Sequence, residues 1–240
     1  MTPLDRLRLE KAAADCGFEM TPVDRDGGLE LRSARFPESV LVRLAGMSTF
    51  EVIAGNALML ATSDGAASVE VNGYEALYDV LRMAAAHART LPNRVADAFR
   101  FDTASLPRST EAERLVVQRV GQNLFRSALL DYWQGQCCVT GLDVPELLRA
   151  SHIKPWASCD NDDERLDVFN GLLLAPHVDA LFDGGWISFA DDGRVLVSDA
   201  LHGEAQTLLS VSAQWCARPI KAEHREYLAF HRLYQFRRSV

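Results

Sequence analysis

Long apolar runs are absent from this 240-residue sequence, and so is a cysteine pattern that would build a disulfide framework. No stretch approaches the roughly 18 apolar residues that a membrane-spanning helix needs, and the opening MTPLDRLRLEK is not a signal peptide. The five cysteines are odd in number and scattered, at positions 16, 137, 138, 159 and 216. We therefore expect a cytoplasmic protein with no membrane partner and no disulfide framework.

An excess of positive charge is also missing. The formal net charge of −8 argues against indiscriminate coating of nucleic acid, but it is compatible with a local basic face. We expect such a face near the C-terminus, because residues 218–240 carry six arginine or lysine side chains against two glutamates. The fractions of hydrophobic (48%) and charged (24%) residues are those of an ordinary globular protein, and the length suffices for one large domain or two small ones.

Residues 1–90 predict a small α+β module. The spacing of apolar residues predicts amphipathic helices over 4–16 and 74–90. Short segments rich in β-formers, separated by turn-type stretches, predict a meander of antiparallel strands over 29–32, 40–44, 49–53, 58–61 and 68–71. The module has no cluster of His, Cys or paired carboxylates that would suggest chemistry. It could be a sensing or target-binding module, or a packing or dimerisation domain.

Residues 91–107 are mixed in composition and poorly periodic, which predicts a linker. Thr110 followed by Glu113 is a capping box, and it predicts a helix that continues to residues 132–133. The polar face of this helix carries Arg119 and Arg126, seven residues apart. These two side chains could contact DNA phosphates, brace the rest of the domain or lie on a solvated surface.

The stretch from Cys138 to Phe189 contains histidine, asparagine and aspartate in a suggestive order. Its strings are CVTG, LLRASHIKPW and ERLDVFNGLLLAPHVDALFDGGWISF, preceded upstream by RVGQNLFRSALLDYW. Together they resemble the HNH (ββα-metal) endonuclease superfamily, and more narrowly a bacterial restriction-endonuclease branch with an SHIKPW/NGLLL/LFD signature. The resemblance covers residues 110–240.

Carried over to this sequence, the resemblance implies roles for two residues. His152 matches the general-base histidine of the family, and a neutral imidazole, with a reference pKa of about 6.5, can take a proton from water that attacks a phosphodiester. Asn170 matches the asparagine that fixes the loop holding the base by bonding to backbone, and that reaches the metal in some members. Asn-Gly is also a common turn pair, so Asn170 could serve a simple turn as well.

The resemblance places metal ligands on a short helix after Asn170. Asp179 and Asp183 occupy those positions, and because they are four residues apart, both carboxylates project from one helical face. Aspartates favour a hard ion, Mg²⁺ or Mn²⁺, over Zn²⁺. His177 could be a further ligand or a phosphate contact, and Asp183 could instead cap the turn after the helix. Ser151 stands where many members carry an acidic or histidine ligand.

Positive side chains near the motif are candidates for contacts with the substrate. Arg165 could steady the scissile phosphate or the leaving group, since a guanidinium can bind two oxygens at once. An internal salt bridge with the acidic run 160–164 or with Asp167 is the alternative. Lys154, two residues after the base, could attract the DNA backbone.

The resemblance also bears on zinc. Many members carry paired CxxC knuckles, whereas here the first equivalent is CVTG, with Gly141 in place of the second cysteine. Cys159 and Cys216 have no partners at zinc-ligand spacing. We therefore expect no structural zinc, and we expect Cys137 and Cys138 to pack as small buried hydrophobes.

The sequence thus predicts an α+β protein with an N-terminal antiparallel-sheet module with flanking helices and a C-terminal ββα-metal HNH nuclease domain with additional helices. We expect a recognition or sensing domain with its linker over 1–105, and the HNH endonuclease domain over 106–240 with its core motif at 138–189. The expected activity is metal-dependent hydrolysis of DNA, and the resemblance suggests restriction of foreign DNA.

Two other functions stay open. One is a non-catalytic DNA-binding protein on a degenerate HNH scaffold, and the other is a nuclease for RNA or single strands. A homodimer is a further expectation, because cutting both strands with one site per chain favours two copies.

Overall fold

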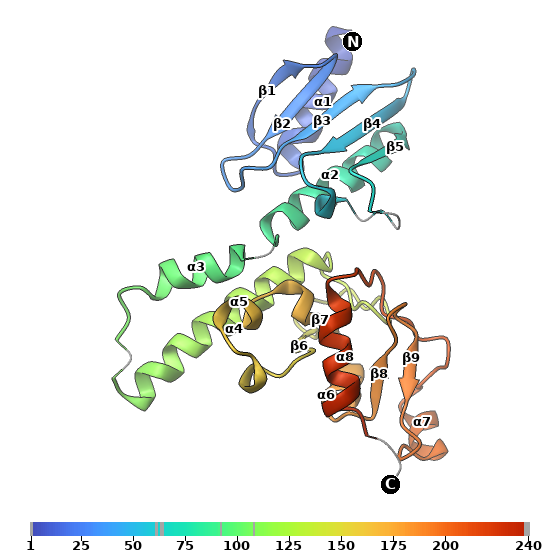
Figure 1. Ribbon diagram of the computed structural model, residues 1–240. Helices are drawn as coiled ribbons and strands as arrows, with labels where there is room; N and C mark the ends of the chain where they lie inside the picture. Colours follow the sequence, from blue (N-terminus) through green and yellow to red (C-terminus); the bar gives the residue numbers. More distant parts are fainter. Residues whose placement is uncertain (1, 61, 63–64, 92, 108, 238–240) are drawn as a thin grey trace. The chain divides into compact units, whose positions relative to one another are not determined.

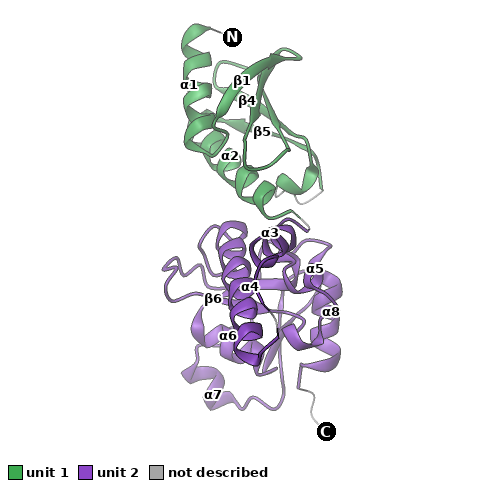
Figure 2. Cartoon of the chain, turned by 90° about the vertical axis from the view of Figure 1, so that its left-hand side faces the viewer, with its two compact units in different colours: residues 1–91 green, residues 92–240 purple. Residues whose placement is uncertain are grey.

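The chain divides into two compact units, and the computed structural model describes residues 2–60, 62, 65–91, 93–107 and 109–237. Unit 1 covers residues 1–91 and unit 2 covers residues 92–240 (Figure 2). This division lies before the predicted boundary after residue 105, because the segment predicted as a linker forms a helix, α3 Arg94–Thr103, that packs against α4 Glu111–Tyr132 of unit 2. Within the described ranges, no helix is both long and apolar enough to cross a membrane.

Unit 1 is built on a five-stranded sheet in which each strand pairs antiparallel with its neighbour in the chain. The strands, in order, are β1 Met20–Arg25, β2 Gly28–Arg32, β3 Val40–Leu44, β4 Thr49–Ala54 and β5 Ser68–Asn72. The last four confirm predicted strands to within one residue at each end. The strand predicted over 58–61 is wrong, since Ala57–Met59 form a short 3-10 helix, η1, and residue 61 lies outside the described residues.

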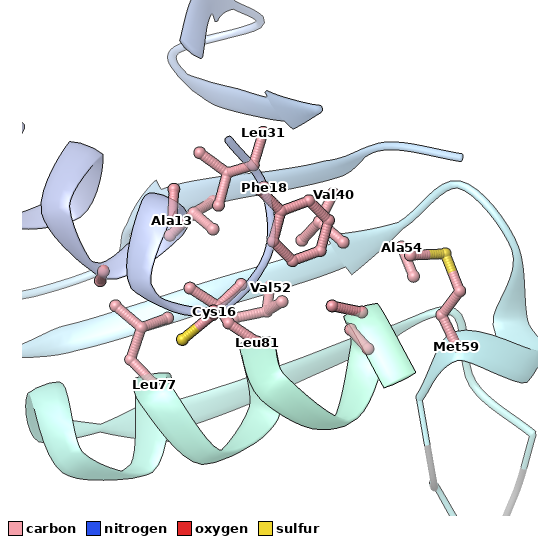
Figure 3. Close-up of a cluster of buried hydrophobic side chains, with 14 of the residues drawn as sticks. Ala13, Cys16, Phe18, Leu31, Val40, Val52, Ala54, Met59, Leu77 and Leu81 are labelled. Carbon is pink, nitrogen blue, oxygen red and sulfur yellow. The ribbon is translucent and has the colours of Figure 1, made fainter. Parts of the chain in front are cut away.

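The core of unit 1 lies between this sheet and two helices, α1 Pro3–Asp15 and α2 Gly73–Arg89 (Figure 1). Both helices confirm the predicted ones to within one residue at each end. Alternation along a strand sends every second side chain to the helix side, as with Val52 of β4. Figure 3 shows Val52 together with Phe18 and with Leu77 and Leu81 of α2 in this buried cluster. Unit 1 therefore has its own core, and the predicted α+β fold class is confirmed.

Unit 2 surrounds a short two-stranded hairpin with helices. Its remaining elements, in chain order, are β6 Arg149–His152, η2 Trp156–Ser158, α5 Asp162–Arg165, η3 Val168–Asn170, β7 Gly171–Leu174, α6 Pro176–Asp183, β8 Ile187–Phe189, β9 Val195–Val197, α7 Gly203–Leu208 and α8 His224–Tyr234. β8 and β9 form a second hairpin. The predicted capping box at the start of α4 is confirmed, because the Thr110 hydroxyl accepts from the Glu113 backbone and the Glu113 carboxylate accepts from the Thr110 backbone.

The hairpin of β6 and β7 is the element that positions the site. The two strands pair antiparallel, with His152 opposite Gly171. α4 packs against both strands, and α6 follows β7 directly and packs against β6 (Figure 1). All four residues of β7 are buried, which agrees with a strand covered on both faces. The order β6, β7, α6 is the strand–strand–helix arrangement that the sequence predicts for this stretch.

Candidate active site

His152 is the last residue of β6, and its ring lies against α4. The imidazole stacks on the ring of Phe125, with centroids 3.9 Å apart and 14° between the planes. Trp156 meets the same imidazole edge-on at 5.5 Å. Glycine at position 171 is needed for this packing, since a Cβ atom there would lie 2.7 Å from Cζ of Phe125. Helix α4 therefore fixes the orientation of the histidine ring.

The two ring nitrogens of His152 have different environments. Nε2 donates a hydrogen bond to the backbone carbonyl of Arg165 at 2.8 Å. Since a carbonyl can only accept, this bond keeps the proton on Nε2 and leaves the lone pair on Nδ1. Burial lowers the pKa of His152 below its usual value, and the hydrogen bond to Arg165 offsets part of that effect. The side chain is therefore a neutral imidazole at neutral pH, with Nδ1 able to accept a proton.

Asn170 is fully buried and ties together the loop between β6 and β7. Its Oδ1 accepts from the backbone N–H of Lys154 at 2.7 Å. Its Nδ2 donates to the carbonyls of Lys154 at 3.2 Å and Glu164 at 3.1 Å, and to the sulfur of Cys159 at 3.4 Å. Glu164 immediately precedes Arg165, whose carbonyl holds the histidine. The amide of Asn170 thus sets the backbone path that orients His152.

Ser151 and two carboxylates of α6 form an oxygen-rich group on the other face of β6. Adjacent residues of a strand point to opposite faces, so Ser151 leaves β6 on the side away from the His152 ring. Burial raises the pKa of the Asp179 carboxyl, the nearby Ser151 hydroxyl lowers it, and the negative charge of Asp183 raises it. A bound cation would relieve the repulsion between the two carboxylates.

His177 lies apart from these carboxylates. It is two residues from Asp179, which is roughly 200° around the helix, and its ring faces Trp215 at 5.8 Å. Among the side chains that the structure describes, no three His, Cys, Asp or Glu residues are arranged as a metal site. Asp179 and Asp183 are brought together and His177 is not.

The oxygen-rich group still fits a hard cation. Two carboxylates and the Ser151 hydroxyl supply oxygen donors only. Mg²⁺ is commonly held by one or two carboxylates, with water and phosphate oxygens completing its coordination. Such an ion does not need a third acidic or histidine side chain.

The hairpin, its loop and α6 lie inside a segment that matches a known family. Residues 137–190 match the family model described as HNH endonuclease. The C-terminal unit carries an HNH domain. This places the segment in the HNH superfamily, a family of nucleases, while the narrower branch with the SHIKPW signature stays a prediction. A search of the curated proteins finds no match.

The two cations predicted nearest to the base are engaged within the loop of the HNH domain. Nζ of Lys154 donates to Glu164 at 2.6 Å, and the side chain is only 14% exposed. The guanidinium of Arg165 donates to Asp162 at 3.0 Å and to the carbonyl of Cys159 at 2.7 Å. Of the two alternatives for Arg165, the internal ion pair with the acidic run is therefore observed, and the residue meets His152 through its backbone carbonyl.

The arginines of α4 differ from each other. Arg126 donates to the carbonyls of Leu148 and Pro145, each at 2.7 Å, and thereby braces the segment that enters β6. Arg119 is exposed and makes no hydrogen bond or ion pair with the residues that the structure describes. Of the roles predicted for these two arginines, Arg126 therefore braces the domain. A DNA contact by Arg119 stays a prediction.

The basic C-terminal stretch of unit 2 is partly engaged in internal contacts. Arg232 pairs with Asp191 at 2.7 Å, and Arg237 lies over the ring of Trp186 with its guanidinium carbon 3.7 Å from the centroid. Arg225 is exposed, and Arg238 lies outside the described residues. These contacts tie α8 and its C-terminal extension to the second hairpin, so only part of the predicted basic face is free for a substrate.

The cysteines at the start of the HNH domain are buried, as predicted. The sulfur of Cys137 accepts from the backbone N–H groups of Thr140 at 3.4 Å and Ala175 at 3.2 Å. Ala175 is the residue that precedes α6. The CVTG turn therefore anchors the beginning of the helix that carries Asp179 and Asp183.

Two residues at the site were not singled out from the sequence. Phe125 stacks on His152, but an apolar residue in an amphipathic helix carries no signal that distinguishes it from other core positions. Arg149 is exposed, and its charge acts on Asp179. A signal for Arg149 does exist, because it stands two residues before Ser151 in a strand and so shares its face.

Proposed function

We propose that this protein is a metal-dependent endonuclease that hydrolyses phosphodiester bonds of duplex DNA, with His152 as the general base. The observation that carries the proposal is the hydrogen bond from Nε2 of His152 to the carbonyl of Arg165. It leaves the lone pair of Nδ1 without a partner among the described residues. A neutral histidine with a free nitrogen, in an HNH domain, is suited to take a proton from water.

Asp179 and Asp183 would hold the divalent ion, with Mg²⁺ or Mn²⁺ the ions that suit oxygen donors. The hydroxyl of Ser151 is close enough to the Asp179 carboxylate to lower its pKa. When bound, the ion supplies positive charge that stabilises the negative charge developing on the phosphate and the leaving oxygen. Burial is the main cause of the raised pKa of Asp179, and the negative charge of Asp183 adds to it. A cation at this place would relieve that repulsion.

The chemistry of the chain's own residues follows from this arrangement. Nδ1 of His152 accepts a proton from water, and the oxygen of that water forms a bond to phosphorus. The bond from phosphorus to the leaving oxygen breaks, and solvent returns a proton to that oxygen. Asn170 positions the base by holding the loop backbone around Lys154 and Glu164.

A cleavage assay with three substrates tests the proposal. Supercoiled plasmid, single-stranded DNA and RNA are incubated with the protein in Mg²⁺, Mn²⁺ or EDTA. We expect nicking or linearisation of the plasmid with a divalent ion and none in EDTA. His152→Ala should lower the rate by about 10²-fold or more, which is the size of a general-base contribution. His202→Ala, at an exposed histidine outside the hairpin, is the matched control and should cut like the wild type.

The outcomes separate the alternatives. Cleavage of RNA or single strands without cleavage of plasmid would replace duplex DNA as the substrate. Cleavage of none of the three substrates with either metal, together with DNA binding unchanged by His152→Ala, would make the protein a binding protein on an HNH scaffold. The restriction of foreign DNA that we propose as the biological role rests on the resemblance to the restriction-endonuclease branch alone.

A further inference from the structure

Few cations of unit 2 are available to a substrate. Within residues 93–107 and 109–237, the arginine and lysine side chains without a hydrogen bond, ion pair or ring contact are Arg119, Arg149 and Arg225. The others are engaged, as Lys154 and Arg165 are with carboxylates of their own loop. Arg149 differs from the other two free cations in one respect, since it is a residue of the β6–β7 hairpin.

Arg149 shares a face of β6 with Ser151. The two residues are separated by one position, so their side chains leave the strand on the same side. Helix α6, which carries Asp179, packs against β6. The Ser151 hydroxyl and the positive charge of Arg149 lower the pKa of the Asp179 carboxyl, against the effects of burial and of Asp183. Arg149 is nevertheless exposed and forms no ion pair with Asp179 within the described residues. An unpaired guanidinium therefore lies next to the candidate ion site.

A phosphodiester offers the negatively charged hydrogen-bond acceptors that this guanidinium lacks. Its two non-bridging oxygens match the planar donors of arginine, which can bind two oxygens at once. Arg165, the arginine that the sequence suggested for this contact, is engaged inside its own loop.

We propose that Arg149 binds the scissile phosphodiester through its guanidinium group, on the carboxylate side of β6. This assignment rests on the proposed nuclease function. It has a consequence that a merely structural role lacks. Next to Asp179, the positive charge of Arg149 opposes binding of a cation while it favours binding of a phosphate. Removal of the Arg149 charge should therefore weaken the binding of DNA, while the binding of the cation stays the same or becomes tighter.

The test compares Arg149→Ala and Arg149→Lys with Arg225→Ala, which removes a free arginine away from the hairpin. Binding of a short fluorescent duplex is measured in EDTA over a range of salt concentrations. We expect Arg149→Ala to weaken binding by about 10-fold and to reduce the slope of log K against log salt by about 0.9, the value for one phosphate contact. Arg149→Lys should keep the slope, because it keeps the charge, but lose kcat/KM because it loses the planar fork.

Calorimetric titration with Mn²⁺ in the absence of DNA supplies the second readout. Arg149→Ala should bind the ion at least as tightly as the wild type, and its melting temperature should equal that of Arg225→Ala. A variant that loses ion and DNA affinity together would point to a structural role and overturn the assignment. An affinity and a slope for Arg149→Ala equal to those of the wild type, while the wild type cuts DNA, would also overturn it. Failure of the wild type to bind or cut any duplex would instead overturn the nuclease function itself.

Discussion

Phe125 controls how basic His152 is. The stacked phenyl ring buries one face of the imidazole, and burial is the main cause of its lowered pKa. A base acts only when deprotonated, so kcat/KM should rise with pH and level off above the pKa of His152. Phe125→Leu admits water to the ring and should raise that pKa toward its usual value. We predict that the acid limb of the kcat/KM profile, measured between about pH 5 and pH 8, moves to higher pH in this variant.

The control for this prediction is Phe230→Leu. Phe230 lies under the Lys154 ammonium at 5.3 Å, in the same unit, and has no ring contact with His152 among the described residues. Its substitution should leave the acid limb at the pH of the wild type, whatever it does to the rate. An unchanged limb in Phe125→Leu would mean that a group other than His152 limits the rate at low pH.

For single residues, the sequence predicted which side chains form the site better than it predicted their hydrogen-bond partners. His152 and Asn170 could be recognised because their chemistry depends on the side chain. The acceptor that fixes the tautomer is the carbonyl of Arg165, and every residue has such a carbonyl, so no sequence signal marks it. Arg126 could not be assigned from the sequence for a related reason. Its acceptors, about 20 residues further along the chain, are backbone atoms whose position depends on the path of the intervening loop.

Among the secondary-structure elements, the spacing of apolar residues was sufficient to predict a helix or strand wherever one of its faces is buried against a core. Strands β2 to β5 were predicted from the alternation of apolar and polar residues, and helices α1, α2 and α4 from helical spacing and caps. The additional strand predicted at 58–61 was wrong. β1 was missed because it is an edge strand with one half-buried residue, Pro22, and otherwise exposed ones. α3 was missed because its ten residues are too few for a clear period and lie between a proline and a polar stretch.

Helix α6 carries two carboxylates one turn apart, and this arrangement can be tested through stability. Asp183 is the last residue of α6, where a negative charge also opposes the helix dipole. In EDTA, Asp183→Asn should raise the free energy of unfolding by a few tenths of a kcal/mol, because like charges at this spacing repel. In Mn²⁺ the wild type should gain stability as the ion binds the folded state, by about 2.7 kcal/mol at an ion concentration one hundred times Kd. Asp183→Asn should lose most of that gain.

Thermal unfolding with and without Mn²⁺ measures both effects. Asp143→Asn is the matched control, because Asp143 is an exposed aspartate outside α6 and away from the carboxylate pair. It should change neither the stability in EDTA nor the response to the ion. An equal response of Asp183→Asn and the wild type to Mn²⁺ would place the ion elsewhere.

On the scale of the whole molecule, the two units have separate cores, and buried histidines make the stability of unit 2 depend on pH. Unit 2 holds two buried histidines on α8, His224 and His231. Burial lowers the pKa of His224 to about 3 and that of His231 to about 4. His231 is hydrogen-bonded to Ser188 of β8 and to the carbonyl of Phe182, so it links α8 to both α6 and the second hairpin. Protonation of either ring would place a charge inside unit 2.

The sign of the effect follows from proton binding. Below about pH 6.5 the unfolded chain binds protons at these histidines and the folded chain does not, so stability falls as pH falls toward the folded pKa values. The carboxyls of Asp167 and Asp179, whose pKa values burial raises, act in the opposite direction at lower pH. The histidine effect begins below about pH 6.5, so we follow it between about pH 6.5 and pH 5, and a histidine variant separates it from the effect of the two carboxyls.

We predict that lowering the pH through this window destabilises unit 2. Calorimetry of the full chain should show the transition of unit 2 moving to lower temperature, by an amount that corresponds to as much as about 1.4 kcal/mol per pH unit for each histidine. Replacement of His231 by Gln, which cannot take up the proton, should remove one histidine's share of this slope while leaving that of His224. A slope that stays unchanged in His231→Gln would mean that the α8 histidine is already protonated in the folded protein, and that its hydrogen bonds to Ser188 and Phe182 do not require the neutral ring.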